Sequence, residues 1–283
     1  MTAPTLPILD NHMHLNPSGR CIEAVKEFAR AGGTHLVLVS LPPWSLGIEI
    51  NRPDDYRQVF DKVLKIAHGV ESEAKVFVVL GVHPAEINRL SERFGLARAC
   101  EIMKGGLEIA CEYVDKGLAV GLKSGRPHYP VDKETWDTSN DIMRRSFEFA
   151  RDSGCAVQLH TETATEEALE EIAGIARGVG LPAERVVKHF APPMVKICER
   201  TGIFPSILAG EDAIKKALGE GDRFMMETDY IDDPKRPGSV LGPKTVPRRT
   251  KQLIPEWGED VFWKIHKENP EKVYGVEISV QAD

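Results

Sequence analysis

The feature that most constrains this 283-residue chain is a repeated alternation of short apolar runs with longer segments of helical periodicity. The runs expected to form strands are 8–14, 36–40, 75–81, 118–122, 156–160, 185–189, 203–206 and 224–227. Helical patterns follow at 21–31, 54–68, 91–116 (interrupted by Gly105-Gly106), 135–152, 166–179, 194–201, 211–218 and 256–269. Strands that are buried on both faces and separated by helices pair in parallel. Eight such units predict an α/β fold, the (β/α)8 TIM barrel.

The alternative architecture is an open, doubly wound sheet that binds nucleotides through glycine-rich turns. The chain has neither a GxGxxG nor a GxxxxGK[ST] pattern, and Gly32-Gly33 precede a strand instead of following one. No repeat, low-complexity block or linker divides the sequence, so residues 1–283 are expected to form a single barrel domain. Residues 234–255 carry five prolines and are expected to form a long ordered loop after the last strand.

Charge and cysteine content restrict the partners. A net charge of −7 and a pI of about 5.8 argue against a surface that is basic overall, so any contact with nucleic acid needs a local basic patch. Five cysteines without a CxxC pair indicate neither a disulfide framework nor a thiolate zinc site. The first residues lack an export signal, and no apolar run suffices for a membrane span. We therefore expect a cytoplasmic protein without a membrane partner and of undetermined oligomeric state.

Polar residues gather at the carboxyl ends of the expected strands, where barrels carry their chemistry. The first run ends in Asp10-Asn11-His12-Met13-His14, and strict alternation would put Asp10, His12 and His14 on one face. The other polar residues at strand ends are His83, Lys123, Arg126, His128, His160, Glu162, His189, Glu227 and Asp229. The three histidines found elsewhere are expected to be structural; they are His35, His68 and His266.

Several of these side chains suit a transition metal. Taken alone, His12 and His14 fit either a polar strand end with solvated rings or part of a metal site. The wider set favours the metal; its expected ligands are His12, His14, Lys123, His160, His189 and Asp229. Imidazole and carboxylate ligands without thiolates indicate one or two divalent ions, zinc first, with manganese, magnesium, iron or nickel as alternatives. Asp229 is the expected catalytic group, accepting the proton of an attacking water.

The order of these motifs resembles the TatD-like branch of the amidohydrolase superfamily. The resemblance rests on Asp10-x-His12-x-His14, Gly81-Val82-His83-Pro84, Leu159-His160-Thr161, His189, Glu227-Thr228-Asp229 and the segment 269–275. The segment 125–130, GRPHYP, is similar to the archaeal type of TatD-related hydrolases. The resemblance implies a (β/α)8 barrel that hydrolyses phosphodiester or related bonds. It also implies that His12, His14 and Asp229 bind a first metal, and His160 and His189 a second.

One position departs from the family pattern, because Lys123 stands where TatD-like proteins carry a bridging glutamate. An ammonium group beside a divalent metal is repelled, and burial favours its neutral form. Three resolutions stay open. Lys123 is carbamylated by CO2, as in phosphotriesterase-like and dihydroorotase-like relatives; or it is unmodified and replaces one cation at a single-metal site; or it points away and leaves a weakened centre.

The substrate side is less constrained. His83, Arg126 and His128 are expected to bind an anionic group such as phosphate, with the alternative that Arg126 pairs with Glu162 or Glu227. The stretch 234–255 holds six cationic residues and no acid, which suits either phosphate binding or a solvated or oligomer-contacting loop.

Three acids are expected to orient the metal-binding histidines, namely Asp10, Glu162 and Glu227; the alternative for Asp10 is a direct metal ligand. Trp44 and Tyr129 provide either walls of the substrate site or ordinary packing.

Three functions follow from these residues. The leading expectation is a TatD-type hydrolase that acts on a small-molecule or nucleic-acid phosphodiester, including DNA. The second is an amidohydrolase or lactonase with a carbamylated Lys123 that acts on a small neutral substrate. The third is a degenerate, non-catalytic barrel that binds metal. Metal content and a panel of substrates separate the three.

Overall fold

A computed structural model describes residues 5–236, 238 and 240–279. The ends of the expected domain, 1–4 and 280–283, lie outside the described residues, as do Pro237 and Ser239 of the expected loop. Residues 1–4 also belong to the segment in which no export signal was expected. Within the described residues, no helix is long and apolar enough to cross a membrane.

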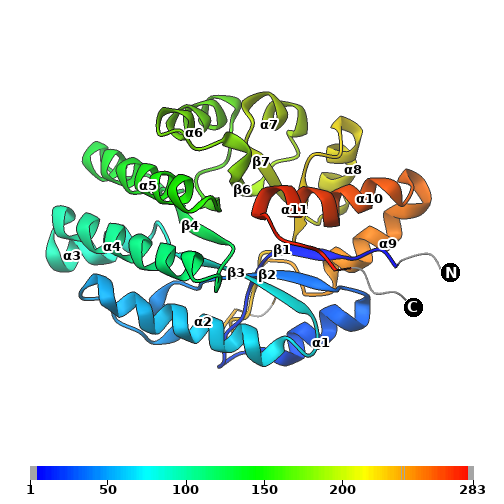
Figure 1. Ribbon diagram of the computed structural model, residues 1–283, viewed down its shortest axis with the longest axis horizontal. Helices are drawn as coiled ribbons and strands as arrows, with labels where there is room; N and C mark the ends of the chain where they lie inside the picture. The colour runs from blue at the N-terminus through cyan, green and yellow to red at the C-terminus, as the bar shows by residue number, and fades with distance from the viewer. Residues whose placement is uncertain (1–4, 237, 239, 280–283) are drawn as a thin grey trace.

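A curled sheet of nine parallel strands occupies the middle of the described structure, with helices around it (Figure 1). The strands are β1 (Leu9–His14), β2 (His35–Val39), β3 (Lys75–Gly81), β4 (Gly121–Gly125), β5 (Ala156–His160), β6 (Val186–Ala191), β7 (Phe204–Leu208), β8 (Met225–Glu227) and β9 (Tyr230–Ile231). Their order is β8-β7-β6-β5-β4-β3-β2-β1-β9. The predicted (β/α)8 barrel is confirmed, with a short ninth strand that the sequence pattern did not indicate.

Helices connect successive strands on the outside of the sheet. They are α1 (Ile22–Ala31), α2 (Tyr56–Val70), α3 (Glu86–Phe94), α4 (Leu96–Asp115), α5 (Lys133–Ser153), α6 (Glu166–Gly178), α7 (Val195–Thr201), α8 (Glu211–Glu220), α9 (Thr245–Trp257), α10 (Asp260–Trp263) and α11 (Asn269–Tyr274). Short helical turns lie at η1 (Pro43–Leu46), η2 (Pro53–Asp55), η3 (Ala183–Arg185) and η4 (Lys264–Glu268). Because parallel strands start at one end of the barrel, all their carboxyl ends open at the other.

The barrel closes where β1 meets the turn between β8 and β9. The Asp10 carboxylate accepts hydrogen bonds from the Thr228 amide at 3.0 Å and from the Thr228 hydroxyl at 2.6 Å. It also accepts a bond from the His12 amide at 3.2 Å. Asp10 was expected to orient an imidazole, but instead it joins two strands and positions His12 through the backbone. Burial is the main reason that the pKa of Asp10 rises to about 7.

β1 does not follow the simple alternation expected for it. Its register against β2 shifts between Asp10 and Met13. As a result, neighbouring side chains both point inside, with Asn11 bonded to Ser206 and His12 to Gln158. The irregularity brings more polar groups into the barrel than a regular strand would.

Apolar side chains fill the amino-terminal half of the barrel interior. Strand residues from β1 to β8, including Leu9, Val79 and Phe204, form one cluster with residues of the carboxyl-terminal segment 273–278. The Tyr274 hydroxyl donates to Asn11 Oδ1 at 2.9 Å and accepts from Gln158 Nε2 at 2.7 Å. This segment closes the bottom of the barrel and leaves the polar mouth at the opposite end.

Several expected boundaries differ from the structure. The helix expected at 256–269 breaks at Gly258, where φ is 81°, and its residues belong to the end of α9, to α10, to η4 and to the start of α11. The helix expected at 91–116 breaks at Gly95, where φ is 79°, and not at Gly105-Gly106. Those two glycines lie inside α4, where a Cβ at Gly106 would come within 2.5 Å of the Tyr56 ring. They allow close packing and do not interrupt the helix.

The strand expected at 118–122 begins three residues later, so Lys123 lies within β4, while Leu118 is exposed. The loop expected at 234–255 contains most of α9. Pro247 lies in the first turn of α9, where a helix tolerates a missing amide proton.

Candidate metal centre

Two histidines from β1 and one aspartate from the β8–β9 turn meet at the mouth of the barrel. Nε2 of His12 lies 3.1 Å from Nε2 of His14, and Oδ1 of Asp229 lies 3.9 and 3.8 Å from these two atoms. Asp229 has a left-handed backbone with φ of 48°. Such conformations are uncommon outside glycine and gather at functional sites. The three side chains form a compact group of candidate metal ligands.

The hydrogen bonds of the two histidines fix where their protons lie. His14 Nδ1 lies 2.9 Å from the Val39 carbonyl and must donate to it, which leaves a lone pair on Nε2. His12 Nδ1 lies 2.6 Å from Oε1 of Gln158. Because the amide nitrogen of Gln158 donates to the Asn11 carbonyl, its oxygen faces His12 and accepts. Both Nε2 atoms are therefore acceptors.

Two buried acceptors that face each other at 3.1 Å repel unless a cation lies between them. Burial and the nearby Lys123 lower the pKa of His12 well below its usual range and that of His14 to about 3, so neither ring is protonated at neutral pH. Two imidazoles on one tetrahedral zinc, at bonds of about 2.0–2.1 Å, hold their nitrogens about 3.3 Å apart. The residues present therefore fit a divalent metal.

A second candidate group combines His12 and His189 with Glu227. The His189 ring stacks on that of His12 at 3.6 Å, and its Nε2 lies 3.9 Å from Oδ1 of Asp229. Its Nδ1 lies 2.7 Å from Oε1 of Glu227 but not in hydrogen-bond geometry. Glu227 was expected only to orient a histidine, whereas its place in this group makes it a candidate ligand as well. Burial and Asp229 raise the pKa of Glu227 well above its usual range.

His160 stands apart from both groups. Its Nε2 lies 3.0 Å from Nδ1 of His128, while its ring centre lies 4.7 Å from that of His83 and 5.6 Å from that of His189. The two histidines expected to bind substrate thus flank His160, and neither group of candidate ligands includes His160. The binding of a second metal by His160 and His189 stays a prediction.

Lys123 points into the centre. Its Nζ lies 3.4 Å from Nε2 of His12, and the side chain is buried. Burial lowers the pKa of Lys123 and raises that of Asp229, while the attraction between the two opposes both shifts. Among the three resolutions left open for this residue, the one in which it points away is wrong.

A second buried lysine, which the sequence analysis missed, adjoins the site. Lys188 donates to the carbonyl of His189 at 2.7 Å, and burial lowers its pKa to about 8. The available signal was a lysine inside the apolar β6 run, directly before a strand-end histidine.

Arg126 does not bind substrate in the way expected. Its side chain is 1% exposed and pairs with Glu162 and Glu171, with Nε 2.9 Å from Oε2 of Glu162. Asn140 accepts a further hydrogen bond at 2.9 Å, and the guanidinium lies 4.4 Å from the Trp136 ring centre. The alternative pairing with Glu162 is the one observed, and it also occupies Glu162, which was expected to orient a histidine. All polar edges of this arginine face protein groups, so it is not an open anion site.

A cavity of about 510 Å³ opens beside Asp229 and His160. One wall is apolar and includes Phe190, Ile207 and Leu208. Phe190 is 48% exposed and has a left-handed backbone with φ of 54°, which is a strained conformation for an aromatic residue. Its amide is held by Glu227 at 2.9 Å. This hydrogen bond therefore holds the strained backbone, which places a large apolar side chain at the edge of the site.

The basic stretch 234–255 is largely engaged with the protein itself. Arg236 lies 2.9 Å from Asp233, Lys244 lies 2.8 Å from Glu27, and Arg249 lies 2.6 Å from Glu211. Lys251 donates to the Ala31 carbonyl at 2.7 Å. These contacts argue against phosphate binding by this stretch and favour the alternative of a solvated or oligomer-contacting segment.

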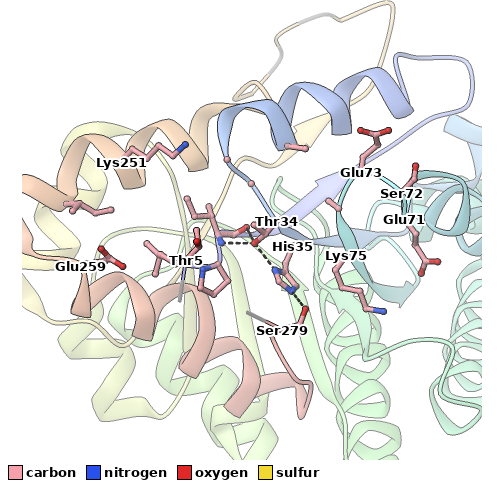
Figure 2. Close-up of a pocket in the computed structure, with 18 residues that line it drawn as sticks. Thr5, Thr34, His35, Glu71, Ser72, Glu73, Lys75, Lys251, Glu259 and Ser279 are labelled. Carbon is pink, nitrogen blue, oxygen red and sulfur yellow. Dashed lines mark hydrogen bonds between the residues drawn. The ribbon is translucent and has the colours of Figure 1, made fainter. Parts of the chain in front are cut away.

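The larger cavity, of about 730 Å³, lies at the opposite end of the barrel and contains no predicted ligand (Figure 2). His35 lines it, with Nδ1 2.8 Å from the Thr34 hydroxyl and Nε2 3.4 Å from the Ser279 hydroxyl. This position at the start of β2 agrees with the structural role expected for His35. His68 is exposed on α2, and His266 is buried against Thr250 and Leu9.

Known proteins resemble this chain over nearly its whole length. The family model described as "TatD related DNase" matches residues 9–275. An uncharacterised protein of Methanocaldococcus jannaschii is 41% identical over 285 residues, which cover 98% of each chain.

Solved structures share the fold. A TatD-like protein of Archaeoglobus fulgidus has a TM-score of 0.66 at 16% identity, covering 95% of this chain and 100% of its own. A TatD homologue of Escherichia coli has a TM-score of 0.68 at 15% identity, covering 95% and 98%. An organophosphorus hydrolase of Deinococcus radiodurans has a TM-score of 0.61 at 12% identity, covering 97% and 94%.

The family match and the identity to the archaeal relative rest on the same span that holds the convergent histidines and Asp229. This chain is a member of the TatD-related DNase family.

Proposed function

We propose that this protein is a divalent-metal-dependent hydrolase that cleaves an ester-type bond of a small organic substrate. The observation that carries the proposal is the pair of proton-free Nε2 atoms of His12 and His14, 3.1 Å apart beside Asp229. A divalent metal bound by these residues would supply a Lewis acid that lowers the pKa of a water molecule towards neutrality.

Neighbouring side chains would handle the proton and the substrate oxygen. The carboxylate of Asp229 lies beside the same two Nε2 atoms, where it can take up the proton that an attacking water releases. His83 Nδ1 accepts a hydrogen bond from the Ala85 amide at 3.2 Å, so its neutral ring carries a proton on Nε2. Burial, followed by the charge of Lys123, lowers the pKa of His83 well below its usual range. His83 would therefore stay a neutral donor to a substrate oxygen.

The charges around the mouth support a small substrate over a nucleic acid. Arg126 is neutralised by two glutamates, and most cations of the stretch 234–255 contact protein groups. The cavity beside Asp229 has an apolar wall and a volume of about 510 Å³, which is within the usual size of small-ligand sites. An extended polyanion would find few free cations there.

For Lys123 we favour the carbamate. The neutral amine nitrogen would add to the carbon of CO2 and lose one proton, and the resulting carboxylate would replace the glutamate of the family pattern. Its position 3.4 Å from Nε2 of His12 supports this assignment, because a carboxylate built there would reach the same ligand group.

Activity of the metal-loaded protein tests the proposal. Protein loaded separately with zinc, manganese, magnesium, iron or nickel is assayed on a lactone, an aryl ester, bis(4-nitrophenyl) phosphate and DNA. We expect turnover of the lactone or ester, and a loss of about 100- to 10,000-fold in kcat for Asp229→Asn. His68→Ala, an exposed histidine on α2, is the matched control and should retain full activity.

A phosphodiesterase is the second candidate, favoured by the imidazoles of His83 and His128 at the mouth, which can donate to phosphoryl oxygens. Turnover of bis(4-nitrophenyl) phosphate or DNA without lactone or ester turnover would support it. A protein that binds metal but hydrolyses none of the four substrates would support the non-catalytic alternative and overturn the proposal.

A further inference from the structure

A second cleft opens at the mouth of the barrel, between η1 and α3. It has a volume of about 370 Å³ and is lined by Trp44, Ile48, Ile50, Arg89, Leu90 and Arg93, among others. η1 follows β2 and α3 follows β3, so both borders of the cleft belong to the end of the barrel that carries the candidate metal centre.

The upper edge of this cleft presents a free cation. The guanidinium of Arg89 lies 4.3 Å from the centre of the Trp44 ring, and both side chains are exposed. In the described part of the chain, no carboxylate pairs with Arg89. A guanidinium stacked on an indole is held in place by the ring while its N–H edges remain available to an anion.

Arg93, one turn further along α3, is built differently. It lies 2.9 Å from Glu49 and donates to Asn51 at 2.6 Å and to the Ile50 carbonyl at 3.1 Å. Arg93 therefore fastens the segment 49–51 to α3 and shapes the cleft wall. Of the two arginines, Arg89 is the one free to recognise a ligand.

One side chain of the cleft wall reaches towards the candidate centre. The Trp44 ring stands edge-on to the His83 ring, with centres 6.3 Å apart, and His83 lies 4.7 Å from His160. At the cleft floor, the carboxylate of the buried Glu86 accepts hydrogen bonds from the His83 amide at 2.6 Å and from the Tyr56 hydroxyl at 2.5 Å. A substrate whose reacting bond sits at the centre could thus extend past His83 into the cleft.

We propose that this cleft is a substrate subsite that takes an anionic group carried on an apolar stem, with Arg89 binding the anion and Trp44, Ile48 and Leu90 contacting the stem. The inference rests on the proposed function, because it places the reacting bond of the same substrate beside His83. Arginine matches carboxylate and phosphate oxygens in pairs, so the anionic group is a carboxylate or a phosphate. The subsite would select acidic esters or lactones over neutral ones of the same size.

Direct binding tests the subsite without any need for turnover. The probes are 4-phenylbutyrate, its neutral amide and 3-phenylpropylphosphonate, titrated into the full-length protein by calorimetry and by tryptophan fluorescence. We expect both anions to bind about tenfold more tightly than the amide. Arg89→Gln should reduce this preference to less than twofold. Trp44→Leu should weaken the binding of all three probes and remove the change in tryptophan fluorescence on binding.

Two further variants make the result specific. Arg30→Gln removes an exposed charge at the other end of the barrel and should leave the tenfold preference intact. Arg89→Lys keeps the charge without the planar fork and should give an intermediate preference. Folding of each variant is checked by thermal unfolding.

An equal affinity for anion and amide in the unaltered protein, or a preference that survives Arg89→Gln, would overturn the subsite. Either result leaves the proposed function standing if lactone or ester turnover is observed. Conversely, an anion preference that depends on Arg89 would stand even in a protein that hydrolyses nothing.

Discussion

Nζ of Lys123 lies 3.4 Å from Nε2 of His12, inside a centre that also holds an aspartate and further histidines. A permanent ammonium there would compete with a metal for the same space. The chemical form of Lys123 therefore decides how much negative charge the side chains of the centre offer to a bound cation.

The first prediction concerns that chemical form. In protein reconstituted with zinc and 13C-labelled bicarbonate, carbon NMR should show one carbamate signal that is absent from Lys123→Arg. Removal of CO2 during reconstitution should lower the bound metal, and Lys123→Glu should bind metal without bicarbonate. A crystal map with a plain lysine side chain, together with metal uptake that ignores CO2, would contradict the carbamate.

The packing of α4 gives a second prediction. A methyl group at Gly106 would lie 2.5 Å from the Tyr56 ring, so Gly106→Ala should destabilise the fold by about 1–3 kcal/mol. The matched control is Gly174→Ala in α6, where a Cβ meets nothing within 4 Å. That change should stabilise the protein by about 0.5–1 kcal/mol, because alanine favours the helix. Urea unfolding measures both, and equal effects at the two sites would contradict the account of this helix contact.

A third prediction follows from the buried His266. Burial lowers its pKa from 6.5 to about 4, so the folded state binds fewer protons than the unfolded state between these values. The contribution of neutral His266 to the free energy of unfolding is complete above pH 6.5. It is lost as the pH falls towards 4, and the loss amounts to at most about 3 kcal/mol.

Unfolding free energies between pH 7.5 and pH 4 check this prediction. His266→Asn should flatten part of the slope, because it removes the group whose pKa folding lowers. An identical slope in His266→Asn would show that other groups cause the acid sensitivity.

The barrel and the convergence of His12, His14 and Asp229 were predictable because strand ends in a parallel barrel share one mouth. Local sequence patterns therefore sufficed to predict which residues, distant in the sequence, meet at the site. The same reasoning put His35 at the opposite end, where it lies.

The failures have a common physical cause, which is side-chain partners that no local pattern reveals. Arg126 was predicted to bind an anionic group of the substrate. In the structure it pairs with Glu171, a residue of α6 that lies far away in the sequence. Asp10 was expected to orient an imidazole, but its carboxylate instead accepts a hydrogen bond from the Thr228 hydroxyl, in the turn that follows β8. The register shift in β1 and the ninth strand depend on barrel closure, which the linear sequence does not display.

The most direct test of the central claim is anomalous diffraction at the zinc absorption edge from crystals of the metal-loaded protein. The account predicts a peak about 2.0–2.2 Å from Nε2 of His12, Nε2 of His14 and a carboxylate oxygen of Asp229. A fully loaded protein with no peak at this position, or with the metal held by other residues, would contradict it.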